Sequence, residues 1–531
     1  MGIGIIQLAA RGIEDIYLTE DPEITFFKSV YKRHTNFHIE SIYQNFVTNP
    51  DFGKSVTCKL SKLGDLIGKI FLYIELPSVS TYSTDKKVAW INNLGYVLIK
   101  ETFIKIGQTV LDKQYGEFMY IWSEVSETNK ESLNDMIGNV PELTTLSSGL
   151  PGYELYIPLQ FWFTKLTSLH LPITALSDDI ELTIVFDTLD NCLIQSPTNS
   201  IKIVEDICPF HPGDYISQTI NNQTVYGYVT GYNYLKKELY YIKMKNKTPC
   251  LKFKAYQNTD NSSQTQTNKT TQGFYGFQPN TTYKKQSPPT TYLTKITDSD
   301  NAPYKIYKIN SPLYVIPEPN SQETTENSTD THMSSNKIQF TTANLYIDYV
   351  YLTSEERDKF LTLEYEYLIE QTQFVKEENV KSSTTINLPF KNSCKELFWV
   401  SSLNIFTNSK INGGVFNYKD MNNMSLIKKS EIFTENSSIT NQRSSEYFQH
   451  TQPYKHHSVI PTSAINMYSF SLHPEQHQPS GTINANLLSL NLTVTLSDTV
   501  NEANECSIRV YATNYQILRI SYTLAVLTDL L

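Results

Sequence analysis

Residues 488–497 alternate between apolar and polar side chains without a break, and this alternation restricts the fold more than any other feature. The apolar positions are Leu488, Leu490, Leu492, Val494 and Leu496, and the polar ones are Ser489, Asn491, Thr493, Thr495 and Ser497. Because successive side chains of a β-strand point to opposite faces, this predicts a strand with one face on a core. Residues 468–472 repeat the pattern, with Tyr468, Phe470 and Leu472 predicted to face inward and Ser469 and Ser471 outward. We therefore expect sheets that bury one face.

The segment 343–374 adds a second constraint, because it predicts a strand, a helix and another strand in succession. Its first part places Leu345, Ile347, Tyr349 and Tyr351 on one face and Tyr346, Val350 and Leu352 on the other. A strand that is apolar on both faces is expected between layers and not at a rim. The run from Thr353 to Glu356 then offers a hydroxyl cap and acidic residues where the helix dipole favours them. Alternation resumes at Tyr365, so we expect one β-sandwich to end here and another to begin.

Helical spacing is limited to short stretches. Phe118, Ile121, Trp122 and Val125 recur at the helical period, and a second short helix is predicted around 132–137. We interpret the apolar side of both helices as packing on the core, with no chemistry of its own.

The character of the chain changes between about 196 and 336. Residues 211–245 still predict short strands joined by Gly and Asn-Asn turns, whereas 257–301 are rich in Asn, Thr, Ser, Gln and Pro. Such segments bury too little apolar area to offset chain entropy, so we expect loops or mobile patches there. Because strands resume at Ala343, we interpret the whole stretch as a long loop insertion in the first sandwich and not as a linker.

Six Asn-x-Ser/Thr motifs fall in this insertion, and they are candidate glycosylation sites. Their asparagines are Asn222, Asn246, Asn261, Asn268, Asn280 and Asn327. One interpretation is a glycan-decorated outer surface. The other, which we favour, is that an Asn- and Thr-rich segment produces this acceptor pattern by chance, and that a cytosolic product does not meet the standard oligosaccharyltransferase.

Charge and cysteine content argue against several classes of function. The net charge is −10 with a pI near 5.6, and no Lys/Arg run is longer than a pair, which argues against direct nucleic-acid binding. The six cysteines form no C-x-x-C pair, which favours a reducing compartment over a disulfide framework or a zinc site. Charged residues make up only 18%, so much of the surface is neutral and tolerates contact with copies of itself. No apolar run reaches the roughly eighteen residues of a membrane span, so we expect a soluble chain made in the cytosol.

The histidines are the obvious candidate metal ligands. They form the pairs His34–His38 and His473–His477, and His450, His456 and His457 fall in a predicted polar loop. An i, i+4 pair serves a metal only on a helix, whereas the first pair spans the entry to a strand and the second contains Pro474. We therefore expect structural hydrogen bonding and not ligation. The FGKS run at 52–55 lacks phosphate-loop spacing and no G-x-S-x-G elbow occurs, so we expect no catalytic, cofactor or metal site and no enzyme activity.

Several long segments together resemble one known family. The run DIYLT..P.ITFFK.VY.RHTNF..ES at 15–41 resembles the amino-terminal signature of the major capsid proteins of large nucleocytoplasmic DNA viruses. Residues 156–176, with IPLQFWF and LPITAL, resemble a second segment of that family. CKELFWV at 394–400, YSF.L.PE.HQPSGT at 468–482 and IRVYATNYQILRI at 508–520 match three more. The resemblance covers most of the chain outside the insertion.

This resemblance implies an all-β fold of two tandem eight-stranded jelly-roll β-sandwiches, a double jelly roll with a few short helices. The expected divisions are an N-terminal arm at 1–36, a first jelly roll at 37–353 with its insertion at about 196–336, a connecting helix at 354–364, and a second jelly roll at 365–531. The resemblance also implies a structural protein of the virion capsid, assembled in the host cytoplasm, which forms homotrimers. These pseudo-hexagonal capsomers would tile an icosahedral shell, contacting neighbouring capsomers, minor capsid proteins and the internal membrane.

Alternative functions share this fold. A minor-capsid or penton paralogue, or a scaffold protein like that of poxviruses, would carry the same two sandwiches, and its abundance in virions would separate it from a major capsid protein. A carbohydrate-binding jelly-roll protein is the alternative from another class. It would need exposed aromatic residues or carboxylates gathered in one groove.

Overall fold

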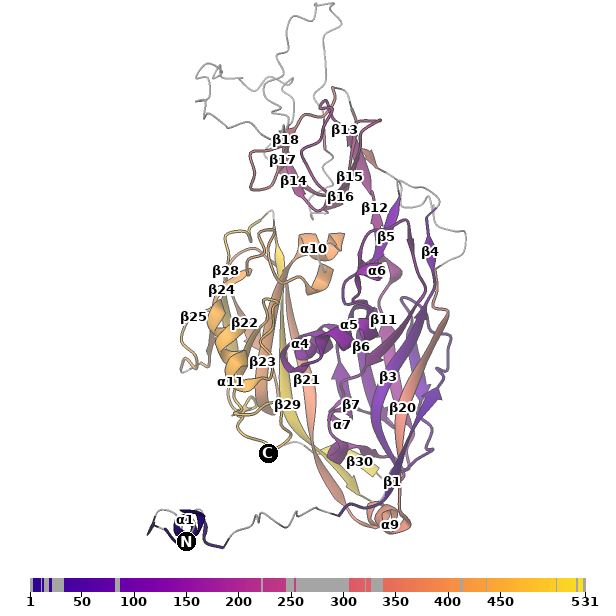
Figure 1. Cartoon of the computed structure of the whole chain (residues 1–531), viewed down its shortest axis with the longest axis vertical. Helices are drawn as coiled ribbons and strands as arrows, with labels where there is room; N and C mark the ends of the chain where they lie inside the picture. The colour runs from indigo at the N-terminus through magenta and orange to yellow at the C-terminus, as the bar shows by residue number, and fades with distance from the viewer. Residues whose placement is uncertain are drawn as a thin grey trace, which may run out of the picture.

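A computed structural model of the chain shows two β-sandwiches side by side, with the insertion at one end and the N-terminal helix α1 (Ile3–Ala9) at the other (Figure 1). The structure describes residues 3–10, 12–13, 19–21, 33–81, 86–220, 223–244, 253–254, 305–319, 321–325, 338–410, 414–435, 437–502, 504–521 and 524–528. None of the helices in these ranges is long and apolar enough to cross a membrane.

The first sandwich consists of two antiparallel sheets. One has the order β1-β20-β3-β10, with β9 also paired to β3, and the other has the order β2-β11-β6-β7. The bounds are β1 (Phe37–Gln44), β2 (Ser55–Lys59), β3 (Leu66–Leu76), β6 (Ile99–Ile106), β7 (Thr109–Gln114), β9 (Tyr153–Pro158), β10 (Leu171–Pro172), β11 (Ile180–Phe186) and β20 (Thr342–Leu352). Two short strand pairs extend its upper end. They are β4 (Val79–Ser80) with β8 (Gly149–Leu150), and β5 (Lys87–Trp90) with β12 (Leu193–Ser196).

The second sandwich repeats this arrangement with the orders β21-β29-β23-β26 and β22-β28-β24-β25. The bounds are β21 (Tyr365–Val380), β22 (Thr384–Leu388), β23 (Ser393–Leu403), β24 (Ile427–Phe433), β25 (Arg443–Ser444), β26 (Asn466–Ser469), β28 (Leu490–Leu496) and β29 (Cys506–Ser521), with β27 (Ile483–Asn484) and β30 (Leu524–Thr528) added at its edges. Counting β9 and β10 as one strand, both sandwiches pair their strands as 1-8-3-6 and 2-7-4-5. This is the jelly-roll order, and it confirms the predicted double jelly roll.

Helices occupy the connections between these strands. They are α3 (Leu94–Leu98), α4 (Gly116–Ser126), α5 (Lys130–Ile137), α6 (Pro141–Thr144), α7 (Trp162–Lys165), α8 (Leu189–Cys192), α9 (Ser354–Thr362), α10 (Asn404–Ser409) and α11 (Gln452–His456), with the short turns η1 (Thr167–Leu169), η2 (Gly414–Phe416) and η3 (Tyr447–Thr451). The helices predicted at 118–125 and 132–137 are confirmed as α4 and α5.

The alternation at 488–497 is confirmed over most of its length. In β28, Leu490, Leu492, Val494 and Leu496 are buried. Leu488, which continues the sequence pattern, is 42% exposed, because the ladder with β22 begins only at Leu490, opposite Leu388.

The prediction for 468–472 is wrong. Ser469 and Ser471, expected outside, are buried, and Leu472, expected inside, is 64% exposed. The reason is that β26 ends at Ser469 and is covered by α11, whose Gln452 accepts a hydrogen bond from the backbone N–H of Ser469 at 3.3 Å. The polar side of this strand is thus an internal contact and not a solvated surface.

The joint between the sandwiches is β20, α9 and β21, as predicted. Ala343, Leu345, Ile347 and Tyr349 of β20 are buried. On the opposite face, expected to be covered as well, Val350 is buried, whereas Tyr346 and Leu352 are half-exposed in the single chain. Thr353 stands at the N-cap of α9, but its side chain makes no capping hydrogen bond. The helix is instead fixed by its Arg357, whose Nε and Nη2 donate to the carboxylate of the buried Asp65 at 2.6 and 3.0 Å.

The insertion leaves the first sandwich after β12 and returns at β20. It is more than a loop, because its described part contains a seven-stranded sheet, β18-β17-β14-β15-β16-β13-β19, with a hydrophobic cluster of its own. Its strands are β13 (Asn199–Lys202), β14 (Tyr215–Ile220), β15 (Gln223–Asn233), β16 (Glu238–Met244), β17 (Ile306–Lys308), β18 (Tyr314–Val315) and β19 (Thr324–Thr325). The strands predicted at 211–245 are confirmed, because their Tyr, Ile and Val supply an apolar face. The stretch 257–301 lies outside the described residues.

Candidate functional site at the junction of the two sandwiches

Helix α4 of the first sandwich packs on the outer face of the β21-β29-β23-β26 sheet, between the two sandwiches (Figure 1). The ring of Phe118 lies 6.1 Å from that of Phe398 and 5.6 Å from that of Tyr511, between centroids. Tyr120 stacks on Phe416 at 4.8 Å. Because these residues belong to one hydrophobic cluster with the core of the first sandwich, the two sandwiches form one packed unit.

A buried ion pair lies at the centre of this junction. Arg509 Nε of β29 lies 2.6 Å from Glu117 Oε2 of α4, and both side chains are less than 10% exposed. Tyr418 and Tyr511 donate their hydroxyls to the two oxygens of Glu117 at 3.0 and 2.7 Å. Arg509 Nη2 also donates to Ser402 Oγ at 2.9 Å. A buried charge is tolerated only when paired and hydrogen-bonded, and this pair meets that condition.

A second polar network lies nearer the end of the junction that carries α7. Glu370 of β21 binds two lysines, Lys165 Nζ of α7 at 2.8 Å and the fully buried Lys395 Nζ of β23. Lys395 also donates to the Pro474 carbonyl at 2.7 Å. Burial would raise the pKa of Glu370, but the two lysines outweigh it and lower this pKa to about 2. Glu370 is therefore an anion that ties the first sandwich to the second.

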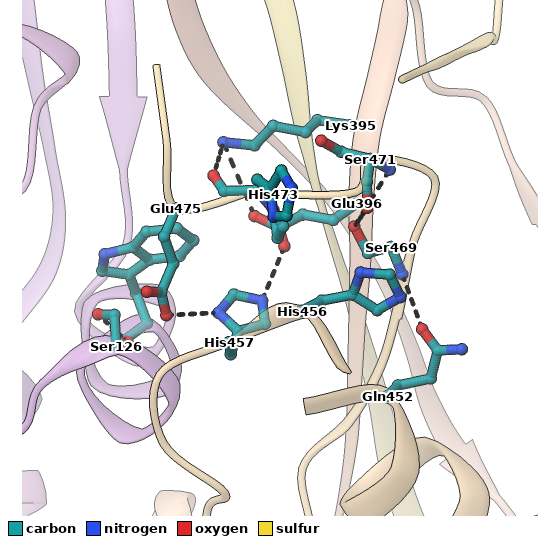
Figure 2. A network of polar contacts seen from close by, with 12 residues as sticks. Ser126, Lys395, Glu396, Gln452, His456, His457, Ser469, Ser471, His473 and Glu475 are labelled. Carbon is teal, nitrogen blue, oxygen red and sulfur yellow. Dashed lines mark hydrogen bonds and ion pairs between the residues drawn. The ribbon is translucent and has the colours of Figure 1, made fainter. Parts of the chain in front are cut away.

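His457 extends this network, as Figure 2 shows. Its Nδ1 lies 3.0 Å from Glu475 Oε1 and its Nε2 lies 3.0 Å from Glu396 Oε2. Two carboxylates that accept hydrogen bonds from both ring nitrogens favour the cationic form of the imidazole, because only that form has two N–H donors. Burial alone would lower the pKa of His457, but the hydrogen bonds to the two glutamates raise it.

The charges of the network balance. Its three cations are Lys165, Lys395 and His457, and its three anions are Glu370, Glu396 and Glu475. A cavity of about 250 Å³ opens beside them, lined in part by Trp122 and Trp162. Because its charged groups pair across the junction, this arrangement is suited to holding the two sandwiches in one orientation.

Replacing Glu475 with glutamine should destabilise the chain in a pH-dependent way. The pKa of Glu475 is lowered by the hydrogen bonds from His457 and Ser458, which outweigh burial. Its stabilising effect is present above its unfolded pKa of roughly 4.5 and lost as pH falls through the lower folded value, whereas that of His457 is present below about 6.5 and lost as pH rises through its raised pKa.

We therefore expect the glutamine variant to lose about 1.5–3 kcal/mol of unfolding free energy between about pH 4.5 and 6.5, as for a hydrogen bond to a charged group. The difference from the parent should shrink on both sides of that window, in denaturant unfolding repeated from pH 3 to 9. The matched control is Glu377→Gln, since Glu377 is exposed on β21. A difference that stays constant with pH would contradict the His457–Glu475 pairing.

The sequence-predicted site residues are only partly placed by the structure. The six sequon asparagines, Asn222, Asn246, Asn261, Asn268, Asn280 and Asn327, lie outside the described residues, so their glycosylation stays a prediction. His34 lies before the start of β1 and His38 lies within it, and both are exposed. His456 Nδ1 contacts the Leu472 carbonyl at 3.2 Å. His457, expected in a polar loop, is buried instead, because the end of α11 packs against Trp122 of α4, with ring centroids 5.8 Å apart. In the described ranges no three His, Cys, Asp or Glu side chains gather as a metal site would require, and Cys58, Cys192, Cys208, Cys394 and Cys506 are buried and unbridged.

Sequence reasoning missed the residues that matter most at the junction, Glu117, Arg509, Glu370 and Lys395. A signal was present for two of them. Arg509 interrupts the otherwise apolar start of a predicted strand, IRVY, and Glu117 directly precedes the apolar stripe of α4. A charge inside an apolar pattern indicates a buried partner, but the sequence does not identify it.

Two jelly rolls of identical strand order, locked together by a buried and charge-balanced junction, define the class of this molecule. It is a double jelly-roll structural protein.

Comparison with known proteins specifies the family. Residues 25–234 match the family model described as major capsid protein N-terminus, and 356–526 match that described as large eukaryotic DNA virus major capsid protein. The probable capsid protein 4 of Acanthamoeba polyphaga mimivirus is 41% identical over 99% of this chain and 98% of the relative. The major capsid protein of Phaeocystis pouchetii virus is 27% identical over 98% of each. The solved Faustovirus major capsid protein shares the fold, with a TM-score of 0.60 and 12% identity over 96% of this chain and 95% of that one.

The chain belongs to the major capsid protein family of large eukaryotic DNA viruses. It is a structural component of the viral capsid, which confirms the family, the fold and the structural role that the sequence resemblance predicted.

Proposed function

We propose that this chain forms a homotrimer in which six jelly rolls surround one axis, as a pseudo-hexagonal capsomer of an icosahedral shell. The observation that carries this proposal is the repeated strand order of the two sandwiches, together with the buried junction that holds them in one orientation. A chain with two like units presents similar surfaces at two successive positions of a ring. Three copies then supply six units through a closed cyclic symmetry.

The division of the chain into an arm (1–36), a first jelly roll (37–353), a connecting helix (354–364) and a second jelly roll (365–531) is part of this proposal. The arm would face the interior of the particle and contact minor capsid proteins or the internal membrane, while the insertion would face outward. The placement of α1 and the insertion at opposite ends of the molecule supports this orientation (Figure 1). Neighbouring capsomers would be the remaining partners, and the host cytoplasm the place of assembly.

The mass of the purified chain in solution tests this proposal. The monomer mass is 60.9 kDa, and we expect light scattering behind size-exclusion chromatography to give three times that mass at micromolar concentration, because obligate interfaces bury roughly 2,000 Å² or more. Negative-stain images should show particles with a six-lobed outline. A chain that stays at the monomer mass when concentrated would contradict the trimer.

A further inference from the structure

The two sandwiches of one chain differ in what covers the outer face of their 1-8-3-6 sheet. In the second sandwich this face lies under α4, and β29 is buried on both sides over most of its length. In the first sandwich the corresponding face, on β1, β20, β3 and β9, has no such cover within the described residues. On β3, the side chains on this face are exposed or half-buried, namely Lys69, Phe71, Tyr73 and Glu75. The alternate residues Ile70, Leu72 and Ile74 are buried.

A row of four tyrosines crosses this uncovered face. Tyr156, Tyr73, Tyr346 and Tyr43 come from β9, β3, β20 and β1, one from each strand. The ring of Tyr73 lies 5.0 Å from that of Tyr156 and 5.6 Å from that of Tyr346. Tyr346 is opposite Tyr43 in the strand register, and Tyr43 is 59% exposed. Packed tyrosines with apolar faces and polar tips are typical of the centres of protein interfaces.

The element that covers this face in the second sandwich has a counterpart. Helix α4 lies in the connection from the fifth to the sixth strand of the first sandwich, between β7 and β9. The same connection of the second sandwich, between β25 and β26, holds η3 and α11. Whereas α4 has a sheet packed on it, α11 carries Tyr454, which is 77% exposed, and the exposed Lys455 beside it.

We infer that the η3–α11 surface of one copy packs on the tyrosine row of a second copy, so that the contact between chains repeats the contact that α4 makes within a chain. This inference rests on the proposed trimer and names the surfaces that form it. A contact of this kind joins two different surfaces, and it forms a closed ring only when the last copy meets the first. In a closed ring of three chains, the same kind of contact between sandwiches then occurs six times, three times within a chain and three times between chains.

Charge supports this pairing of surfaces. Among the described residues of β3, β9 and β20 beside the tyrosine row, the acidic ones are Glu75, Glu154 and Asp348, and the basic one is Lys69. The partner surface offers Lys455 beside Tyr454, with Glu446 at its start. Opposite charges at the rim of an interface set its register and speed association more than they add affinity.

The experiment replaces one residue on each surface, Tyr43→Asp and Tyr454→Asp, and measures mass by light scattering across a dilution series. Loss of a buried tyrosine anchor should raise the concentration at which the trimer dissociates by at least about 30-fold. Circular dichroism should stay that of the parent, because both side chains are exposed in one chain. The matched control is Tyr234→Asp, since Tyr234 is 67% exposed but lies on the insertion, and it should leave the trimer intact.

A photo-crosslinking side chain at position 454 gives a second readout. We expect crosslinked peptides from 37–44, 66–76, 153–158 or 342–352 of another chain, identified in a mixture of isotope-labelled and unlabelled protein. If the parent protein is a trimer and both aspartate variants remain trimers, the pairing of surfaces is wrong but the trimer stands. Crosslinks from position 454 to other surfaces would lead to the same conclusion. A parent protein that is monomeric would instead refute the proposed function itself.

Discussion

Replacing Arg509 with leucine is expected to lower the free energy of unfolding by about 3–5 kcal/mol, as for one partner removed from a buried ion pair. The substitution leaves the carboxylate of Glu117 buried at the junction, with only the hydroxyls of Tyr418 and Tyr511 as donors. It also removes the donor to Ser402. Guanidinium unfolding, followed by tryptophan fluorescence and circular dichroism, measures the loss.

The same strand provides a matched control. Arg519 of β29 pairs with Glu366, but both side chains are about half exposed, at 51% and 53%. Arg519→Leu should therefore cost less than about 1 kcal/mol, since exposed ion pairs contribute little. Replacing both Glu117 and Arg509 with leucine should cost less than the sum of the single changes, because no unpaired charge then remains. Equal losses for Arg509→Leu and Arg519→Leu would contradict the central role of the buried pair.

The second large effect is expected at Lys395. Lys395→Met keeps the length of the side chain but removes the charge that meets Glu370 and the donor to the Pro474 carbonyl. Because Lys395 is fully buried, we expect a loss of about 3–5 kcal/mol. Lys165 keeps part of the pairing with Glu370, so the chain should still fold, and the loss is measurable as a lower thermal midpoint.

Lys376→Met serves as the control for this prediction. Lys376 lies on β21 and pairs with Glu378, with side chains 39% and 59% exposed. It should change the midpoint little, because solvent already screens the pair. A Lys395 variant as stable as this control would show that the network beside α7 is not what holds the sandwiches together.

Many strands of this fold were predictable because they bury one face and leave the other partly exposed. In β28 the four buried residues from Leu490 to Leu496 are those that the alternation selects. The helix α4 was predictable for the same reason, from Phe118, Ile121 and Val125 at the helical period. The strands at 211–245 were predicted, but the size of the sheet in the insertion was underestimated, because its strands lie within a segment that is otherwise polar.

The junction was not predictable to the same extent. Ser469 and Ser471 have the pattern of a solvated face, yet both are buried. His457 has the pattern of a loop residue, yet it joins two glutamates inside the molecule. In each case the polar side chain forms its hydrogen bonds with protein groups instead of water. The sequence pattern of a polar residue is the same in the two situations, so it does not distinguish them.

The sequence by itself determined that this chain builds strands with an apolar face, and which family it resembles. Only the tertiary structure decided what the second face of each sheet contacts. Tyr511 reaches Glu117 across 394 positions of the chain, and the tyrosine row gathers four strands that the sequence scatters. The physical reason is that periodicity along a strand reports which of its faces avoids water. What the other face contacts depends on how whole sheets stack, and that stacking brings together segments that are distant in the sequence.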